Sequence, residues 1–188
     1  MTISHSIREM MQKGSWIRQM FEEGTRLKAL HGVENVFDFS LGNPILEPPQ
    51  VVHDELLNLL NNPPSGMHRY MPNKGFPETC EYVANIMRHE TGYAFASEDV
   101  VMCVGAGGGL NVVFKALIEP GDEVLTLAPF FVEYAAYARN HGGLLTTANT
   151  NSEFQPDLSS VEEKMNENTK IVLINSPNNP TGTIYSQQ

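Results

Sequence analysis

A run of small residues from Gly105 to Gly109, GAGGG, separates an apolar segment from a helical pattern. Small residues let a ligand approach the backbone closely, and free N–H groups at a helix start attract an anion such as a phosphate. The run matches neither G-x-x-x-x-G-K-[ST] nor G-x-G-x-x-G, and Lys115 lies too far along the chain to act as a P-loop lysine. A tight turn with glycines needed for packing is the alternative interpretation.

Two other segments with unusual chemistry also follow predicted strands. The segment from Pro129 to Tyr134 contains Phe131, whose ring could stack on a planar ligand or pack in the core. The segment SPNNPTG from Ser176 to Gly182 holds two asparagines between prolines. A side-chain amide fixed there can donate to a ring oxygen, although Asn, Pro and Gly are also ordinary turn residues.

Strands and helices alternate from residue 100 onward, which predicts parallel strands joined by right-handed crossovers. Ligands bind at the carboxyl ends of such strands, so we expect the three segments to lie at one edge of the sheet. The predicted strands are Val100–Val104, Glu123–Leu127, Leu144–Thr147 and Ile171–Ile174, and the helices between them are Leu110–Leu117, Pro129–Asn140 and Leu158–Asn166.

The first hundred residues predict mainly helices. Met1 to Leu30 has apolar residues at helical spacing, interrupted at Gly14 and stopped at His31-Gly32. Its polar face mixes both charge signs, which favours packing against protein over a membrane surface. The elements expected after it are a short strand at Val36–Leu41, a helix at Val51–Leu60, an irregular stretch at Asn61–Gly75 and a helix at Pro77–Thr91.

Composition excludes several classes of partner. The 188 residues contain 12 Lys and Arg against 22 Asp and Glu, a net charge of −10. Such an acidic chain is a poor ligand for nucleic acid or for anionic membranes, and no apolar run is long enough for a membrane span. Cys80 and Cys103 match no metal-ligand or disulfide pattern and lie in apolar surroundings. We expect two buried, reduced thiols, no metal site and a cytoplasmic location.

Four motifs in order carry a resemblance to a known family. The chain is similar to the class I and II aminotransferases, pyridoxal 5'-phosphate enzymes of fold type I, and fits the aspartate-aminotransferase-like members best. The motifs are LGNP at Leu41–Pro44, Y-x-P-x-x-G at Tyr70–Gly75, GAGGGL at Gly105–Leu110 and NNPTG at Asn178–Gly182.

The resemblance implies an α/β fold. Residues 46–188 are expected to form the N-terminal part of an incomplete three-layer α/β/α large domain, and residues 1–45 a helical arm that belongs to a small domain. The resemblance places the neighbours of the predicted strand Val100–Val104 in a later part of the family's chain. We therefore expect that strand to lack its partners here and to leave open edges.

The resemblance also implies roles for the cofactor phosphate. Gly105, Ala106 and Gly107 are expected to line it, with the backbone N–H groups of Ala106 and Gly107 as donors. Tyr70 is expected to reach the phosphate in the partner subunit's site, so its role requires a homodimer.

Three residues are expected to bind the cofactor ring and the substrate. Phe131 occupies the position where the family stacks an aromatic residue on the pyridine ring. Asn179 is expected to donate to the ring's phenolic oxygen and to line the substrate site. The backbone N–H of Gly42 is expected to bind the substrate carboxylate.

The family's imine-forming lysine lies in an S-x-S-K-like context beyond the NPTG loop, and no lysine of this chain has that context. The six lysines are Lys13, Lys28, Lys74, Lys115, Lys164 and Lys170. No catalytic residue is therefore assigned, and we expect a truncated chain that is inactive alone. Lys74 is expected to be a solvated loop residue, and Glu133 and Arg69 solvated residues near the site.

The resemblance implies transfer of an amino group between an amino acid and a 2-oxo acid. A pyridoxal-phosphate lyase of the same fold, which catalyses β-elimination, would carry similar N-terminal motifs and remains an alternative. A non-catalytic module, as in regulators with an aminotransferase-like domain, is a second alternative. The first thirty residues show no helix-turn-helix with a basic face, which such regulators usually carry.

Overall fold

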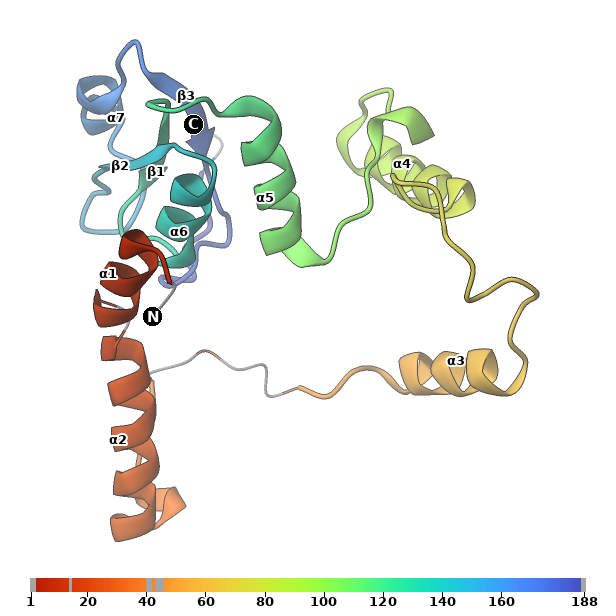
Figure 1. The fold of residues 1–188 in the computed structure, drawn as a ribbon, viewed down its shortest axis with the longest axis horizontal. Helices are drawn as coiled ribbons and strands as arrows, with labels where there is room; N and C mark the ends of the chain where they lie inside the picture. The colour runs from red at the N-terminus through yellow and green to blue at the C-terminus, as the bar shows by residue number, and fades with distance from the viewer. Residues whose placement is uncertain (1–2, 14, 40–41, 43–45, 187–188) are drawn as a thin grey trace. The chain divides into compact units, whose positions relative to one another are not determined.

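The computed structural model describes residues 3–13, 15–39, 42 and 46–186. The chain divides into two compact units, Met1–Arg69 and Tyr70–Gln188 (Figure 1). Each unit is described by itself. The expected boundary at residue 45, between a helical arm (residues 1–45) and the large domain (residues 46–188), stays a prediction.

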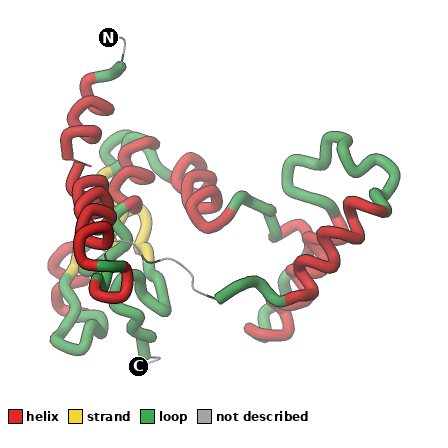
Figure 2. Tube along the Cα trace, turned by 90° about the horizontal axis from the view of Figure 1, so that it is seen from below, coloured by secondary structure: helices red, strands yellow, loops and turns green. Residues whose placement is uncertain are grey.

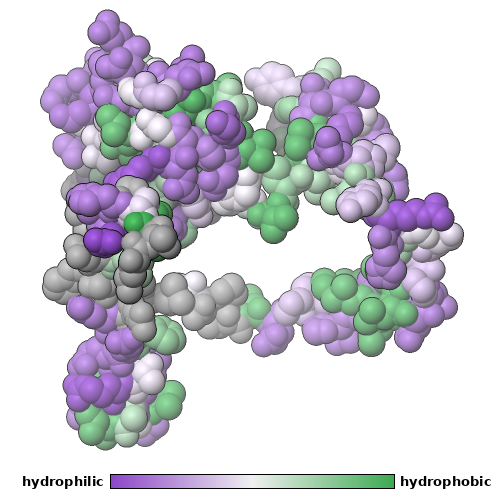
Figure 3. All heavy atoms as spheres, viewed as in Figure 1, coloured by the Kyte–Doolittle hydropathy of each residue, from purple (hydrophilic) through white to green (hydrophobic). Residues whose placement is uncertain are grey.

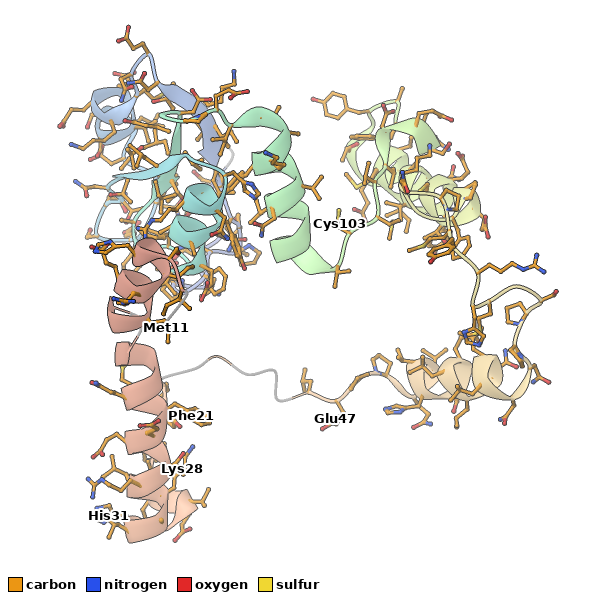
Figure 4. All side chains as sticks on the ribbon, viewed as in Figure 1. Met11, Phe21, Lys28, His31, Glu47 and Cys103 are labelled. Carbon is orange, nitrogen blue, oxygen red and sulfur yellow. The ribbon has the colours of Figure 1, made fainter. Side chains whose placement is uncertain are left out.

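The first unit is helical. Helices α1 (His5–Lys13) and α2 (Ser15–His31) confirm the expected helical segment over its described residues, and α2 is followed by Gly32 at a φ of 86°. Gly14, where an interruption is expected, lies outside the described residues. A short 3-10 helix η1 (Val33–Asn35) comes next. Figure 4 shows Phe21, Lys28 and His31 on α2, and the Lys28 ammonium donates to the Asp38 carboxylate at 2.7 Å.

The strand expected at Val36–Leu41 is not formed over its described residues, 36–39. A strand needs a backbone partner, and no described residue of this unit pairs with the segment. Ser40 and Leu41 lie outside the described residues.

Helix α3 (Gln50–Asn61) confirms the helix expected after Pro48-Pro49. Five of its six apolar side chains are exposed, and apolar residues of this helix appear in green in Figure 3. The five are Val51, Val52, Leu56, Leu57 and Leu60.

The second unit begins with a loop, helix α4 (Pro77–Thr91) and the 3-10 helix η2 (Ser97–Asp99). Helix α4 has the predicted bounds and ends at Gly92, in a left-handed conformation with a φ of 75°. Lys74 corrects the prediction of a solvated loop residue. It is half-buried, its ammonium donates to the Ser97 carbonyl at 3.1 Å, and its own carbonyl accepts from the Met102 N–H at 2.8 Å.

Three parallel strands form the sheet, in the order β2-β1-β3. They are β1 (Glu123–Leu127), β2 (Leu144–Ala148) and β3 (Thr169–Leu173), and Figure 2 shows them in yellow. Three of the four predicted strands are thus confirmed, with ends shifted by at most two residues. Because β1 lies between the other two, four of its five residues are buried.

Helices cover both faces of the sheet. On one face α5 (Gly105–Leu117) and α6 (Glu133–Asn140) bury Phe114, Ile118 and Ala138 against Val124 of β1. On the other face α7 (Leu158–Lys164) packs Val161 against a cluster that contains Leu125. Val124 and Leu125 point to opposite faces because side chains alternate along a strand. The arrangement confirms the predicted three-layer α/β/α architecture.

The segment Val100–Val104 is not a strand, which corrects the prediction. Its one backbone hydrogen bond to another segment joins Met102 to Lys74, and no described strand lies beside it. Val104 is 96% exposed, and Cys103, expected to be buried, is exposed as well (Figure 4). Cys80 is buried as predicted. Without a neighbouring strand, an apolar segment cannot form the repeated backbone hydrogen bonds of a sheet.

Two helix starts also differ from the prediction. Helix α5 begins at Gly105 rather than Leu110, so the glycine run forms its first turns. Helix α6 begins at Glu133 rather than Pro129, because the segment before it forms turns instead. Helix α7 ends at Lys164, two residues before the predicted end.

Asp157 caps the start of α7, which predicts a pH dependence of stability. Its carboxylate accepts from the Ser159 hydroxyl at 2.6 Å and from the N–H groups of Ser159 and Ser160. These hydrogen bonds lower the Asp157 pKa below its usual 3.8, and the bond from the Ser159 hydroxyl makes the largest contribution. Because the folded-state pKa is lowered, the stabilisation is present above about pH 3.8 and is lost as pH falls through the lowered value.

We expect Asp157→Ala to lower the urea midpoint of unfolding at pH 7. The difference in urea midpoint between this variant and the wild type should become smaller as the pH falls from 5 to 2.5. Asp157→Asn keeps a capping side chain that does not titrate. The difference in urea midpoint between Asp157→Asn and Asp157→Ala should therefore stay constant over that pH range. A gap between wild type and Asp157→Ala that is independent of pH would contradict this assignment.

Candidate functional site

The first turn of α5 presents unpartnered backbone donors. The first four N–H groups of a helix have no partner within it, and the Gly105 N–H donates instead to the Cys103 carbonyl at 3.1 Å. The N–H groups of Ala106 and Gly107 therefore lack intrahelical acceptors, whereas the Gly108 N–H is opposite the carbonyl of the N-cap residue, Val104. No side chain caps this end, and no acidic residue lies in the first turn. The arrangement favours an anion at this position.

Gly107 lies against helix α6. A Cβ atom at this residue would lie 2.9 Å from the Tyr137 hydroxyl oxygen, closer than real contacts allow. At Gly109, one further half-turn along, a Cβ would meet nothing within 4 Å. A side chain at 107 therefore requires Tyr137 or the first turn of α5 to shift, whereas a side chain at 109 does not. This distinction between neighbouring glycines could not be made from the sequence.

Phe131 lies in the loop after β1 and is partly buried. Its ring meets that of Tyr134 edge to face, with centroids 5.5 Å apart and planes at 80°. Tyr134 is buried, and this burial, with smaller contributions from Tyr137 and Tyr185, raises the pKa of its phenol. The neutral, fixed Tyr134 ring holds the Phe131 ring at the carboxyl end of β1.

The two asparagines of the loop after β3 have different environments. Asn179, predicted to contact the cofactor ring, is exposed, whereas Asn178 is buried. The Asn178 amide donates to the Pro129 carbonyl at 3.0 Å and to the Thr181 hydroxyl at 3.1 Å. It therefore joins the loop after β3 to the loop after β1. Sequence reasoning gave Asn178 no role, although the double asparagine between prolines was a signal.

We expect Asn178→Ala to destabilise the second unit. The change leaves the Pro129 carbonyl without its donor in a partly buried position, which costs about 1–3 kcal/mol. Urea unfolding followed by far-ultraviolet circular dichroism measures the effect. Asn179→Ala is the matched control and should change the free energy of unfolding by less than about 0.5 kcal/mol, because surface substitutions generally do. Equal losses in the two variants would contradict the structural role of Asn178.

The remaining predicted site residues are all exposed. Gly42 belongs to the first unit, and the rest of its motif, Leu41, Asn43 and Pro44, lies outside the described residues. Tyr70 begins the second unit, and its side chain is fully exposed. Glu133 and Arg69 are exposed, in agreement with the solvated roles expected for them. The candidate site is therefore left with Phe131 and the asparagine loop at two strand ends, and with the start of α5, which lies against Tyr137 of α6.

Neither a metal-ligand cluster nor a membrane-spanning helix occurs among residues 3–13, 15–39, 42 and 46–186. No three His, Cys, Asp or Glu side chains there gather closely enough to hold a metal ion. None of the helices described is long and apolar enough to cross a membrane.

An aromatic ring and an amide-rich loop thus follow the neighbouring parallel strands β1 and β3, and the second unit also holds an uncapped helix start. A sequence model of the family "Aminotransferase class I and II" matches residues 34–188. The chain belongs to this family. Members use pyridoxal phosphate, and the uncapped first turn of α5, free of carboxylates, suits its phosphate group.

Individual relatives agree with the family assignment. The chain is 33% identical over 156 residues to a probable aspartate/prephenate aminotransferase of Aquifex aeolicus, covering 82% of this chain and 39% of that protein. It is 31% identical over 183 residues to an aspartate aminotransferase of Pyrococcus horikoshii. This match covers 96% of the present chain and 44% of that protein. The chain thus spans less than half the length of these relatives.

Solved structures agree as well. The fold matches an amino transferase of Eubacterium rectale with a TM-score of 0.90 and 38% identity, over 100% of this chain and 48% of that one. It also matches an aspartate aminotransferase of Thermus thermophilus, solved with maleate, with a TM-score of 0.76 and 30% identity. This match covers 91% of the present chain and 44% of that one. The structure therefore has part of the α/β fold of the fold type I aminotransferases.

Proposed function

We propose that this chain forms the phosphate-binding part of a pyridoxal-phosphate aminotransferase that moves an amino group between an amino acid and a 2-oxo acid. The observation that carries the proposal is the uncapped glycine-rich start of α5, which lies against Tyr137 of α6; the two strand-end loops joined by Asn178 add to it. Aspartate is the first amino donor to test, because relatives of this chain are named aspartate aminotransferases.

When bound, the cofactor supplies an electron-withdrawing ring that makes bonds at the substrate's α-carbon easier to break. This chain's residues would bind and orient that group. The Ala106 and Gly107 N–H groups donate to the phosphate, and Gly105 sets the turn at a φ of 67°. Phe131 contacts the ring face, and the Asn179 amide donates to the ring oxygen. No lysine of this chain is proposed to react, so the chain alone is expected to be inactive.

A homodimer in the cytoplasm belongs to the same proposal. Its support is the Tyr70 side chain, which is fully exposed where the family role needs it to reach a second subunit. The backbone N–H of Gly42 is proposed to bind the substrate carboxylate.

The test is an amino-transfer assay on the longest natural polypeptide that contains these residues. With aspartate, a 2-oxo acid and pyridoxal phosphate, we expect formation of the new amino acid to require both substrates. Release of ammonia from the amino acid without any 2-oxo acid would indicate a lyase and would contradict the proposal.

A further inference from the structure

A tyrosine of α6 lies against the first turn of α5. The Tyr137 hydroxyl oxygen is 2.9 Å from the place that a Cβ atom of Gly107 would take. A Cβ atom is two bonds from the nitrogen of its own residue, and two bonds of about 1.5 Å each span at most about 3 Å. The hydroxyl oxygen therefore lies within about 6 Å of the Gly107 nitrogen, whose N–H lacks an intrahelical acceptor.

Packing holds both Tyr137 and Gly107 in place. The half-buried side chain of Tyr137 packs against a core cluster of four residues, Phe114, Ile118, Val124 and Ala138. The Asn111 side-chain amide donates to the Gly107 carbonyl at 2.8 Å, and His141 Nε2, just after α6, lies 3.1 Å from Asn111 Oδ1. The Tyr137 hydroxyl therefore faces the first turn of α5 at a defined position.

The Tyr137 hydroxyl is available to a bound group. Within the part of the chain that the structure describes, it makes no hydrogen bond to another residue. A partly buried phenol hydroxyl normally finds a hydrogen-bond partner. No acidic side chain lies in the first turn of α5, and the N–H groups of Ala106 and Gly107 have no acceptor within the helix. Three donors without a competing carboxylate favour an anion as their common partner.

We propose that the Tyr137 hydroxyl donates a hydrogen bond to the cofactor phosphate at the start of α5, beside the Gly107 N–H. A phosphate group has three acceptor oxygens, so it can accept from both donors at once. The inference rests on the proposed function, because it assumes that a phosphate binds at this helix start. It adds a side-chain donor from α6, which none of the four sequence motifs includes.

The test compares binding of pyridoxal phosphate and of pyridoxal, which lacks the phosphate, to the 188-residue chain by isothermal titration calorimetry. Tyr137→Phe removes the hydroxyl and keeps the ring that packs against the core. We expect the preference of this variant for the phosphorylated ligand to fall about tenfold, the factor that one hydrogen bond to a charged group supplies. Its affinity for pyridoxal should stay unchanged. A purely structural role would weaken both ligands equally.

Tyr185→Phe is the matched control, because it removes the same hydroxyl group elsewhere. The Tyr185 ring is also partly buried against a core cluster, but this cluster contains Leu125 and lies on the other face of the sheet. Tyr185→Phe should leave the preference unchanged. A preference kept in Tyr137→Phe, or an equal loss for both ligands, overturns this inference alone. A wild-type chain with no preference for pyridoxal phosphate over pyridoxal overturns the phosphate site of the proposed function, and this inference with it.

Discussion

Gly107→Val is expected to weaken binding of pyridoxal phosphate about tenfold to a hundredfold. The added Cβ would lie 2.9 Å from the Tyr137 hydroxyl, so the first turn of α5 or Tyr137 must move. Movement of that turn misdirects the N–H donors, and each hydrogen bond to a charged group contributes about 1.5–3 kcal/mol. A loss of 1.4 kcal/mol corresponds to a tenfold change in affinity. The dissociation constant is measured by calorimetric titration.

Gly109→Val separates this effect from helix propensity. Both changes introduce the same β-branched residue into the same helix, at positions where φ is not positive, but a Cβ at 109 meets nothing within 4 Å. Gly109→Val should therefore bind pyridoxal phosphate within about threefold of wild type. Equal losses in the two variants, or unchanged affinity in Gly107→Val, would place the phosphate elsewhere.

The second large effect concerns the lysines. We expect that no lysine of this chain forms a stoichiometric, site-specific adduct with pyridoxal phosphate that borohydride can fix. Lys74 is held by the Ser97 carbonyl, and Lys28 and Lys164 are paired with Asp38 and Glu163.

The three remaining lysines are placed away from the candidate site. Lys115 lies about 15 Å along α5 from Gly105, at 1.5 Å per residue. Lys170 lies near the start of β3, at the edge opposite the strand-end loops. Lys13 ends α1 in the first unit.

Peptide mapping by mass spectrometry after borohydride reduction measures this prediction. An intact aspartate aminotransferase treated in parallel is the positive control and should give one labelled lysine. In the present chain we expect only partial labelling spread over several lysines. One fully labelled lysine, at position 74 or elsewhere, would refute the assignment of no catalytic residue to this chain.

The sequence predicted those elements whose partners lie within the chain. The strands Glu123–Leu127 and Leu144–Ala148 pair with each other, and α4 is fixed by Pro77 at its start and Gly92 at its end. The strand predicted at Val100–Val104 has the right apolar pattern but no neighbour in the described sheet. Local pattern indicates what a segment can form, whereas pairing decides whether it does.

The candidate site was predicted at the level of segments but not of single side chains. Two of the four motifs identified the α5 start and the asparagine loop, and the segment after the predicted strand Glu123–Leu127 identified Phe131. They could not show that Asn178 rather than Asn179 joins two loops, or that Asn111 and His141 connect to Gly107. The first contact depends on how the loops after β1 and β3 meet, and the others on how α5 packs against α6; neither has a signature in a single sequence.

The central claim is that the start of α5 binds the cofactor phosphate. Titration of the wild-type 188-residue chain with pyridoxal phosphate, and separately with pyridoxal, tests it most directly. We predict saturable binding of pyridoxal phosphate at least about tenfold tighter than that of pyridoxal, since even one charged hydrogen bond supplies this factor. We also predict competition by inorganic phosphate. Equal affinities for the two ligands, or no effect of inorganic phosphate, would contradict the account.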